Sequence, residues 1–187
     1  MLFCCMDVVE LALTGLKLLK PTLFRDERGF FYESYRNNQR DALDLPEFVQ
    51  GNCSHSKAGV VRGLHYQTSP GQAKLVSCVK GKIFDVAVDL RCESKTFGMW
   101  HSVILSEQDP QMFFIPVGFA HGFCALEDAL VIYDVSAYYD AATEMTIRWN
   151  DPTLNIAWPI QNGIVSKRDQ NAPFFNEVFS AYLGNGR

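Results

Sequence analysis

The sequence lacks a long hydrophobic run, because no stretch of about 18 consecutive apolar residues occurs in its 187 residues. We therefore expect neither a membrane-spanning helix nor a membrane partner. The N-terminal segment MLFCCMDVVELAL also lacks the positive charges of a secretory signal and includes acidic Asp7 and Glu10. We expect a cytoplasmic protein in which either Met1 or Met6 is the true start, with residues 1–5 a dispensable tail.

The chain has no surplus of basic residues, since 17 Lys and Arg stand against 21 Asp and Glu, for a formal net charge of −4. Nucleic-acid-binding domains usually carry the opposite balance, so we expect no nucleic-acid partner. A local basic pocket for a small phosphorylated ligand remains compatible with this charge.

Metal-binding patterns are missing as well. The six cysteines contain no CxxC pair, and reduced thiols in a cytosol are the simplest interpretation. Gln67 stands where an HxH pair would have its second histidine, and His121 is isolated in PVGFAHGF. Because metal sites commonly use three or more His, Asp or Glu ligands, we expect no metal. A metal-dependent barrel enzyme is a rival hypothesis, and it predicts that chelation abolishes activity.

The sequence does contain many short segments typical of strands. In GKIFDVAVDL the residues alternate between two faces, and VVELALTGLKL near the N-terminus follows the same period of two. HSVILS, QMFFIPV and ALVIYDVSAYY are rich in β-branched or aromatic residues and are separated by turn-forming pieces. NNQRDALDL is the best candidate for a short helix, which Pro46 would end. We predict one all-β domain over residues 1–187, an antiparallel jelly roll or barrel with a few short helices.

The segment RGLHYQ places Arg62 and His65 at the end of an apolar stretch, and Lys74 interrupts GQAKLVSCV as that strand begins. A single histidine in such a setting is more often a hydrogen-bonded core residue than a catalyst. The nearby cations favour a site instead, because buried Lys and Arg are unfavourable unless paired or solvated. Their convergence on one cavity predicts an anionic ligand. His55 and His101 lie in polar surroundings and are expected on the solvated surface.

Arg62 and His65 are three residues apart, so strict strand alternation would place them on opposite faces. If both face one cavity, Gly63 must host a β-bulge, which its missing side chain permits. The spacing therefore predicts a bulge at Gly63.

Two later segments add polar groups. VIYDVSAYYDAATEMTIRW brings Tyr133, Tyr138, Tyr139 and Glu144. The simplest interpretation of at least one of these tyrosines is a ring that fills the barrel with its hydroxyl at the mouth. GIVSKRDQNAPFF is expected to be a polar loop holding Lys167, Arg168 and Asp169, and it matters for function only if it folds back to the barrel.

Six ordered blocks of the chain resemble one known family. They are DERGFFYES, FVQGNCSHSKAGVVRGLHYQ, KLVSCVKGKIFDVAVDLR, SKTFGMW, FFIPVGFAHGF and IRWNDPTLNIAWP, and the match runs to SKRDQNAPFF, over nearly the whole chain. The chain is similar to the dTDP-4-dehydrorhamnose 3,5-epimerase family, which are nucleotide-sugar epimerases with a cupin-type jelly roll. The resemblance implies a homodimer and a dTDP-4-keto-6-deoxy sugar as the substrate.

The resemblance also implies roles for single residues. His65 looks like the base that removes a proton, Asp169 like the carboxylate that orients this base, and Tyr133 like the acid that returns a proton on the opposite face. Lys74 looks like a catalytic group of the sugar site, and Asp85 like a partner for His121. The implied substrate-binding residues are Arg28, Glu33, Gln50, Asn52, Arg62, His121, Tyr139, Glu144 and Arg168.

The chemistry of a 4-keto sugar suits these residue types. The hydrogens on C3 and C5 both lie α to the carbonyl, so removing either one leaves an enolate that a preorganised cation such as Lys74 stabilises. A histidine backed by a carboxylate is a suitable base near neutral pH, and no redox cofactor or metal is required. We therefore expect a cofactor-independent epimerase that converts dTDP-4-dehydro-6-deoxy-D-glucose into dTDP-4-dehydro-L-rhamnose.

Two alternatives stay open at this point. One is an epimerase that inverts a single carbon or acts on another nucleotide-linked 4-keto sugar. The other is a non-catalytic nucleotide-sugar binding module. Two positions also differ from the usual family pattern: Arg168 stands where a lysine is common, and Asp134 follows Tyr133, where a carboxylate is expected to tilt the strand or alter sugar preference.

Overall fold

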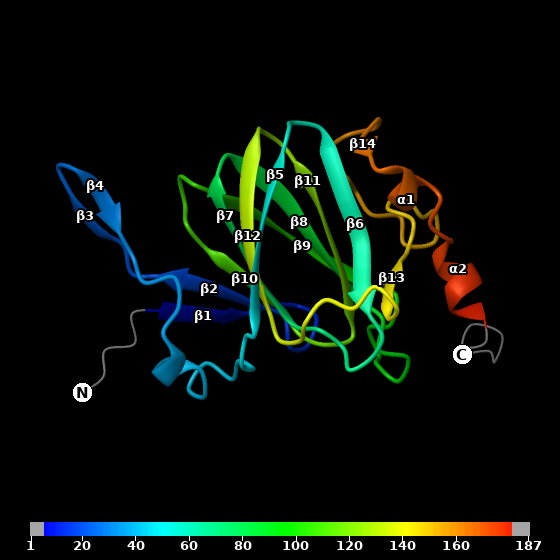
Figure 1. Cartoon of the computed structure of the whole chain (residues 1–187), viewed down its shortest axis with the longest axis horizontal. Coiled ribbons are helices and arrows are strands. Elements are labelled where there is room, and N and C mark those ends of the chain that lie inside the picture. Colours follow the sequence, from blue (N-terminus) through cyan, green and yellow to red (C-terminus); the bar gives the residue numbers. More distant parts are fainter. Residues whose placement is uncertain (1–5, 181–187) are drawn as a thin grey trace.

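The computed structural model describes residues 6–180. The expectation that residues 1–5 form a dispensable tail therefore lies outside the described part of the chain. Residues 6–180 form mainly antiparallel strands with a few short helices, as predicted. Two large sheets face one another across a buried core (Figure 1). No helix in this part of the chain is long and apolar enough to cross a membrane.

The first large sheet has the strand order β1–β2–β10–β7–β12–β5, with every neighbouring pair antiparallel. Its strands are β1 (Met6–Glu10), β2 (Lys17–Pro21), β10 (Met112–Ile115), β7 (Lys74–Lys80), β12 (Ala129–Val135) and β5 (Gln50–Ser56).

The second large sheet has the order β13–β6–β11–β8–β9, and β14 adds to β6 in parallel. Its strands are β13 (Glu144–Thr146), β6 (Val60–Gln67), β11 (Phe119–Ala125), β8 (Lys82–Asp89), β9 (Trp100–Ser106) and β14 (Ile164–Val165).

A separate hairpin and three short helices complete the described elements. The hairpin, β3 (Phe24–Asp26) and β4 (Gly29–Phe31), projects from the end of the molecule away from α1 and α2 (Figure 1). The helices are η1 (Asn37–Gln39), which is a single 3-10 turn, α1 (Lys167–Gln170) and α2 (Phe175–Val178). The last polar segment, expected to be a loop, thus contains a strand and a helix.

Strand β8 confirms the predicted alternation. Ile83 and Ala87 belong to the core cluster between the two sheets, whereas Val86 and Val88 join a second buried cluster that includes Phe175 of α2. Burying a side chain of this size contributes roughly 1.5–3 kcal/mol. Both faces of β8 are therefore covered. This packing holds Asp85, which lies between Ile83 and Ala87 on one face of the strand, in a fixed position.

The prediction of one strand over VVELALTGLKL is wrong in its middle. Strand β1 ends at Glu10 and β2 begins at Lys17, and a turn joins them. Leu13 and Leu16 are only 2% and 0% exposed because this turn inserts them into the core between the sheets. Buried leucines in a connection therefore imitate the period of a strand.

The predicted helix over NNQRDALDL is also much shorter than expected. Only its first residues form η1, and irregular turns follow. Leu43 and Leu45, two residues apart, both enter a buried cluster with Leu19 and Met112, a spacing that a continuous helix would place on different sides. Asp44 between them has a φ of 51°, which reverses the chain.

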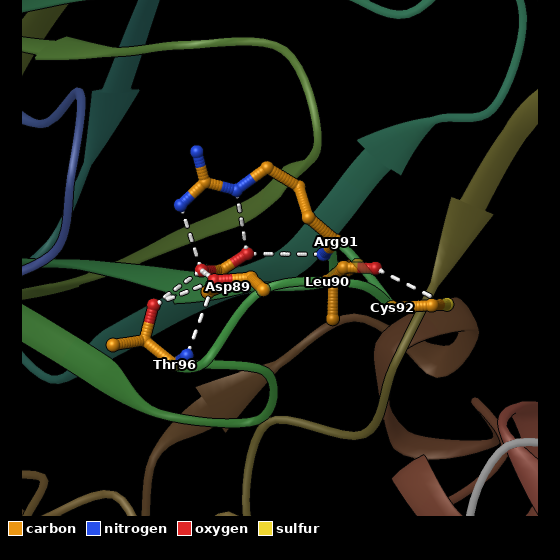
Figure 2. Close-up of polar contacts among 6 residues, drawn as sticks. Asp89, Leu90, Arg91, Cys92 and Thr96 are labelled. Atoms are coloured by element: carbon orange, nitrogen blue, oxygen red, sulfur yellow. Dashed lines mark hydrogen bonds and ion pairs between the residues drawn. The ribbon is translucent and has the colours of Figure 1, made fainter.

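One buried carboxylate organises the loop after β8 (Figure 2). Asp89 accepts two hydrogen bonds from the Arg91 guanidinium at 2.8 and 2.7 Å and one from the Thr96 hydroxyl at 2.6 Å. Burial alone would raise the pKa of Asp89, but these donors outweigh it and lower the pKa to about 2. The Arg91 guanidinium also lies 4.5 Å from the centre of the Phe119 ring. This network ties the end of β8 to β11.

Candidate active site

Strand β6 carries a β-bulge at Gly63. His65 pairs with His121 of β11 and Arg62 pairs with Phe123, so three steps along β6 match two steps along β11. Gly63 has a φ of 128°, and a Cβ there would lie 2.5 Å from a Cα atom of β11. The extra residue lets Arg62 and His65 line the same cavity. The predicted bulge is confirmed.

His65 is hydrogen-bonded to Asp169, with 2.8 Å between Nε2 and Oδ1. The carboxylate arrives from α1, which lies beside β6 (Figure 1). At the start of this helix the Ser166 hydroxyl accepts the Asp169 N–H at 3.1 Å. Burial opposes ionisation of Asp169, but the hydrogen bonds from His65 and the Gly63 N–H prevail and lower its pKa. Because an ionised carboxylate only accepts, Nε2 carries the hydrogen, and Nδ1 of a neutral His65 keeps its lone pair.

Lys74 is the buried cation of the cavity. It is 7% exposed at the start of β7, and its Nζ donates to the backbone carbonyl of His65 at 3.4 Å. Burial lowers its pKa to about 8, against the opposing pull of the Glu144 and Asp85 carboxylates. At neutral pH the ammonium is therefore mostly charged. Among the described residues no ion pair to Lys74 is formed, so the ammonium can stabilise negative charge that develops on a ligand without first losing a partner.

A second histidine–carboxylate pair lies beside the first in the same sheet. His121 Nε2 lies 2.8 Å from Oδ1 of Asp85, which is 0% exposed. Burial lowers the pKa of His121, although the Asp85 carboxylate opposes this. The expected partnership is present as a hydrogen bond. It holds a neutral His121 in one orientation on the strand next to His65.

Tyr133 enters the cavity from the opposite sheet, since it lies on β12 whereas His65 lies on β6. Burial and the Glu144 carboxylate raise the pKa of its phenol, and Arg62 opposes this. The phenol is therefore protonated at neutral pH. Asp134 lines a different surface depression, together with Tyr32 and Ile132, because successive strand residues point to opposite faces. Its carboxylate does not face the cavity.

The cavity has a volume of about 400 Å³ and a polar mouth. Gln50 donates to the Asn52 side chain at 2.8 Å, and its carbonyl oxygen accepts the Tyr139 N–H at 3.1 Å. Arg168 pairs with Glu144 at 2.5 Å. The structure thus brings together twelve of the predicted residues. Those lining the cavity are Gln50, Asn52, Arg62, His65, Lys74, His121, Tyr133, Tyr139, Glu144 and Arg168, with Asp85 and Asp169 behind the histidines.

The sequence interpretation missed two polar lining residues, Ser54 and Gln72. Ser54 continues the alternating polar series of β5 that starts with Gln50 and Asn52, and its buried hydroxyl has no hydrogen-bond partner. Gln72 precedes Lys74 by two residues. In both cases the period of two was a usable signal.

Two predicted substrate-binding residues do not reach this cavity. Arg28 lies in the β3–β4 hairpin, where its guanidinium pairs with Asp26 at 2.5 Å and its side chain is 84% exposed. Glu33 follows the hairpin and pairs with Arg36. Within one chain, neither side chain lines the space that holds His65.

The other histidines take no part in the site. His55 is exposed on β5, as predicted, whereas His101 is half-buried and burial lowers its pKa, so the prediction of a solvated surface position is only partly correct for it. Among residues 6–180, no three His, Cys, Asp or Glu side chains are grouped so as to hold a metal ion.

Comparisons with known proteins agree on one family. A family model described as dTDP-4-dehydrorhamnose 3,5-epimerase matches residues 10–177. A curated dTDP-4-dehydrorhamnose 3,5-epimerase from Neisseria gonorrhoeae is 48% identical over 167 residues, which are 88% of this chain and 51% of that protein. The chain therefore spans about half the length of that relative.

Two solved structures are close in both sequence and fold. The dTDP-6-deoxy-D-glucose-3,5-epimerase of Legionella pneumophila in complex with dTDP-4-keto-L-rhamnose is 42% identical, with a TM-score of 0.89 and coverage of 95% of this chain and 96% of that one. ChmJ, a 3'-monoepimerase from Streptomyces bikiniensis in complex with dTDP-quinovose, is 35% identical, with a TM-score of 0.84 and coverage of 93% and 89%.

Proposed function

The chain belongs to the dTDP-4-dehydrorhamnose 3,5-epimerase family, and from that premise we propose how its cavity carries out the epimerase reaction. The substrate is dTDP-4-dehydro-6-deoxy-D-glucose, and inversion at C3 and C5 yields dTDP-4-dehydro-L-rhamnose. The proposal rests on one observation: the His65–Asp169 pair and the Tyr133 phenol enter a single cavity from facing sheets. A sugar ring between them meets a base on one side and an acid on the other.

Each inversion breaks one C–H bond and makes another at the same carbon. Nδ1 of His65 takes the proton α to the C4 carbonyl, and the electron pair moves into an enolate whose oxygen carries the charge. Asp169 stabilises the imidazolium that forms, and the Lys74 ammonium stabilises the enolate oxygen. The Tyr133 phenol then delivers its proton to the opposite face of the carbon. The protonated His65 and the deprotonated Tyr133 return to their starting states by exchange with solvent.

No net oxidation occurs in this reaction, so the proposed chemistry needs no redox cofactor. Because the Lys74 ammonium supplies the positive charge for the enolate, it needs no metal either. His121, held by Asp85, lies on the strand beside His65, and the free ring nitrogen of its neutral form accepts a hydrogen bond from a sugar hydroxyl. Arg62 and Arg168, which line the cavity, are suited to the diphosphate, because guanidinium groups bind phosphate oxygens with two hydrogen bonds at once. The space left for the nucleoside is bordered by Gln50, Asn52, Tyr139 and Glu144.

The proposed active form is a homodimer in which Arg28 and Glu33 reach the cavity of a second copy. Support comes from the hairpin that carries Arg28, because it projects from the molecule and exposes Phe24, Phe30 and Phe31 by 52%, 43% and 65%. Exposed apolar residues grouped on a projecting element are typical of an interaction surface. A formal net charge of −4 supports the absence of a nucleic-acid partner, and a nucleotide-sugar substrate suits a cytoplasmic enzyme.

The decisive test follows the reaction in heavy water. Purified protein is incubated with dTDP-4-dehydro-6-deoxy-D-glucose in D₂O and the sugar protons are followed by NMR. Deuterium at both C3 and C5 supports the double epimerase. Deuterium at one carbon alone supports the single-carbon alternative. This alternative is retained because the chain is also similar to the 3'-monoepimerase ChmJ.

A variant separates catalysis from mere binding. His65→Ala should lower the exchange rate by roughly 100- to 10,000-fold, the contribution of a positioned general base, while dTDP affinity, measured by calorimetry, stays within about threefold. Unchanged exchange would remove His65 from the role of base. Wild-type protein that binds dTDP without any exchange would instead favour the non-catalytic binding module.

A further inference from the structure

The loop between β12 and β13 carries Tyr139 to the cavity mouth, yet it has little apolar packing to hold it. Tyr138 and Tyr139 are 70% and 55% exposed, and residues 136–143 form no regular element. In Figure 1 this loop runs from the end of β12 to β13, past the ends of the strands that carry the site. Side chains with weak packing keep a fixed position only if the backbone beneath them is held by hydrogen bonds.

Three glutamine side chains hold three consecutive residues of this loop. The Gln72 amide donates to the Ala137 carbonyl at 2.8 Å, and the Gln67 amide donates to the Tyr138 carbonyl at 3.3 Å. The Gln50 side-chain carbonyl accepts the Tyr139 N–H at 3.1 Å. Gln50, Gln67 and Gln72 are hereafter called the glutamine clamp. A glutamine amide offers both a donor and an acceptor without a charge.

The position of the clamp follows from the period of the strands. Gln67 comes two residues after His65 on β6, and Gln72 comes two residues before Lys74. Side chains two residues apart share a face of a strand, so Gln67 lies on the same face of β6 as His65, while Gln72 lies in the segment that leads into β7 at Lys74. Gln67 is only 8% exposed, as expected for a residue that the loop covers. The loop is thus tied to the same strands that carry the base and the cation.

We propose that Gln67 and Gln72, together with Gln50, are positioning residues that act through Tyr139 and set the affinity for the nucleotide end of the substrate. This inference rests on the proposed function for the identity of the ligand. The clamp keeps the Tyr139 backbone where its side chain borders the cavity and so reduces the entropy lost when the ligand is bound. Gln67 and Gln72 do not themselves take part in proton transfer.

The test uses Gln67→Met and Gln72→Met, singly and together, because methionine keeps the length of the side chain and removes its amide. In the double variant, hydrogen exchange of amides 137–140, followed by mass spectrometry, should be at least about tenfold faster. KM should rise roughly tenfold, the value expected for two lost hydrogen bonds of ordinary strength, while kcat stays within about twofold. In a Tyr139→Ala background the same double change should add little to KM.

The matched control is Gln108→Met, on an exposed loop where the amide donates to its neighbour Glu107 at 3.4 Å. It should alter neither exchange at 137–140 nor KM. Unchanged exchange in the double variant overturns the clamp, and faster exchange with an unchanged KM overturns its role in binding. A loss of kcat, or a full further rise in KM in the Tyr139→Ala background, overturns action through Tyr139.

Failure of the proposed function would look different. Wild-type protein without turnover of the proposed substrate would refute the epimerase assignment, whereas the hydrogen-exchange comparison and the affinity for dTDP alone would still decide whether the clamp positions the loop.

Discussion

At the scale of single residues, the site combines ionisable groups whose environments shift their pKa values in different directions. His65 and His121 each donate to a buried carboxylate, and Tyr133 is held in its protonated form by burial. Burial penalises the charge of Lys74 and lowers its pKa to about 8. The resting protein therefore presents a neutral acid, a carboxylate-backed base and a cation at neutral pH.

This arrangement predicts a pH profile for Lys74. Since the proposed role of the Lys74 cation is to stabilise the enolate, kcat/KM should be highest below a pH of about 8 and fall as the pH rises through it, as the ammonium loses its proton. The profile is measured from about pH 6 to about pH 10. Lys74→Arg should be slower but should lack the decline near pH 8, because a guanidinium stays charged. The same decline in the arginine variant would assign it to another group.

At the scale of elements, the bulge in β6 decides which side chains meet. If β6 were a regular strand between Arg62 and His65, which are three residues apart, one of them would face away from the cavity. The bulge requires Gly63, both because of its φ of 128° and because β11 leaves no space for a Cβ.

Gly63→Ala should therefore destabilise the protein through strain and crowding together. Gly29→Ala is the matched control, because Gly29 has a similar φ of 131° but open space around its Cβ position. Gly63→Ala should lower the free energy of unfolding by at least about 1–3 kcal/mol more than Gly29→Ala, the usual cost of overpacking. Urea unfolding followed by circular dichroism measures both. Equal losses in the free energy of unfolding would show that β11 moves away from the new Cβ at no energetic cost.

At the scale of the whole molecule, the projecting hairpin and the cavity lie at separate places on one chain, so the proposed nucleotide-binding role of Arg28 depends on a second copy. Phe31, at the end of β4, is 65% exposed. Within a single chain its replacement should cost little.

Phe31→Asp should weaken the proposed dimer, because a charged group replaces an apolar one at the interface, and should raise KM at the same time since Arg28 no longer reaches its site. Sedimentation velocity measures the association, and steady-state kinetics the KM. Met99→Asp, at a residue 53% exposed on the loop before β9, is the control and should change neither. A Phe31→Asp protein that stays dimeric with an unchanged KM would contradict the shared site.

Several features of fold and site were readable in the sequence because they depend on local spacing. The alternation of β8 predicted two faces, and the three-residue interval from Arg62 to His65 predicted the bulge. Local spacing also misled: Leu13 and Leu16 imitate a strand in what is a turn, and the Leu43–Leu45 pair lies where a helix was expected. In both failures, burial of leucines by distant strands overrides the local pattern.

The amino-acid sequence by itself determined the strands, the place where one strand must bulge and the kinds of groups available for proton transfer, since each follows from residue type and spacing of a few positions. The tertiary structure alone decided which of these groups meet. Asp169 reaches His65 across 104 residues, and Tyr133 faces them from the other sheet, because the core between the sheets brings the strands together. No local pattern encodes that distance.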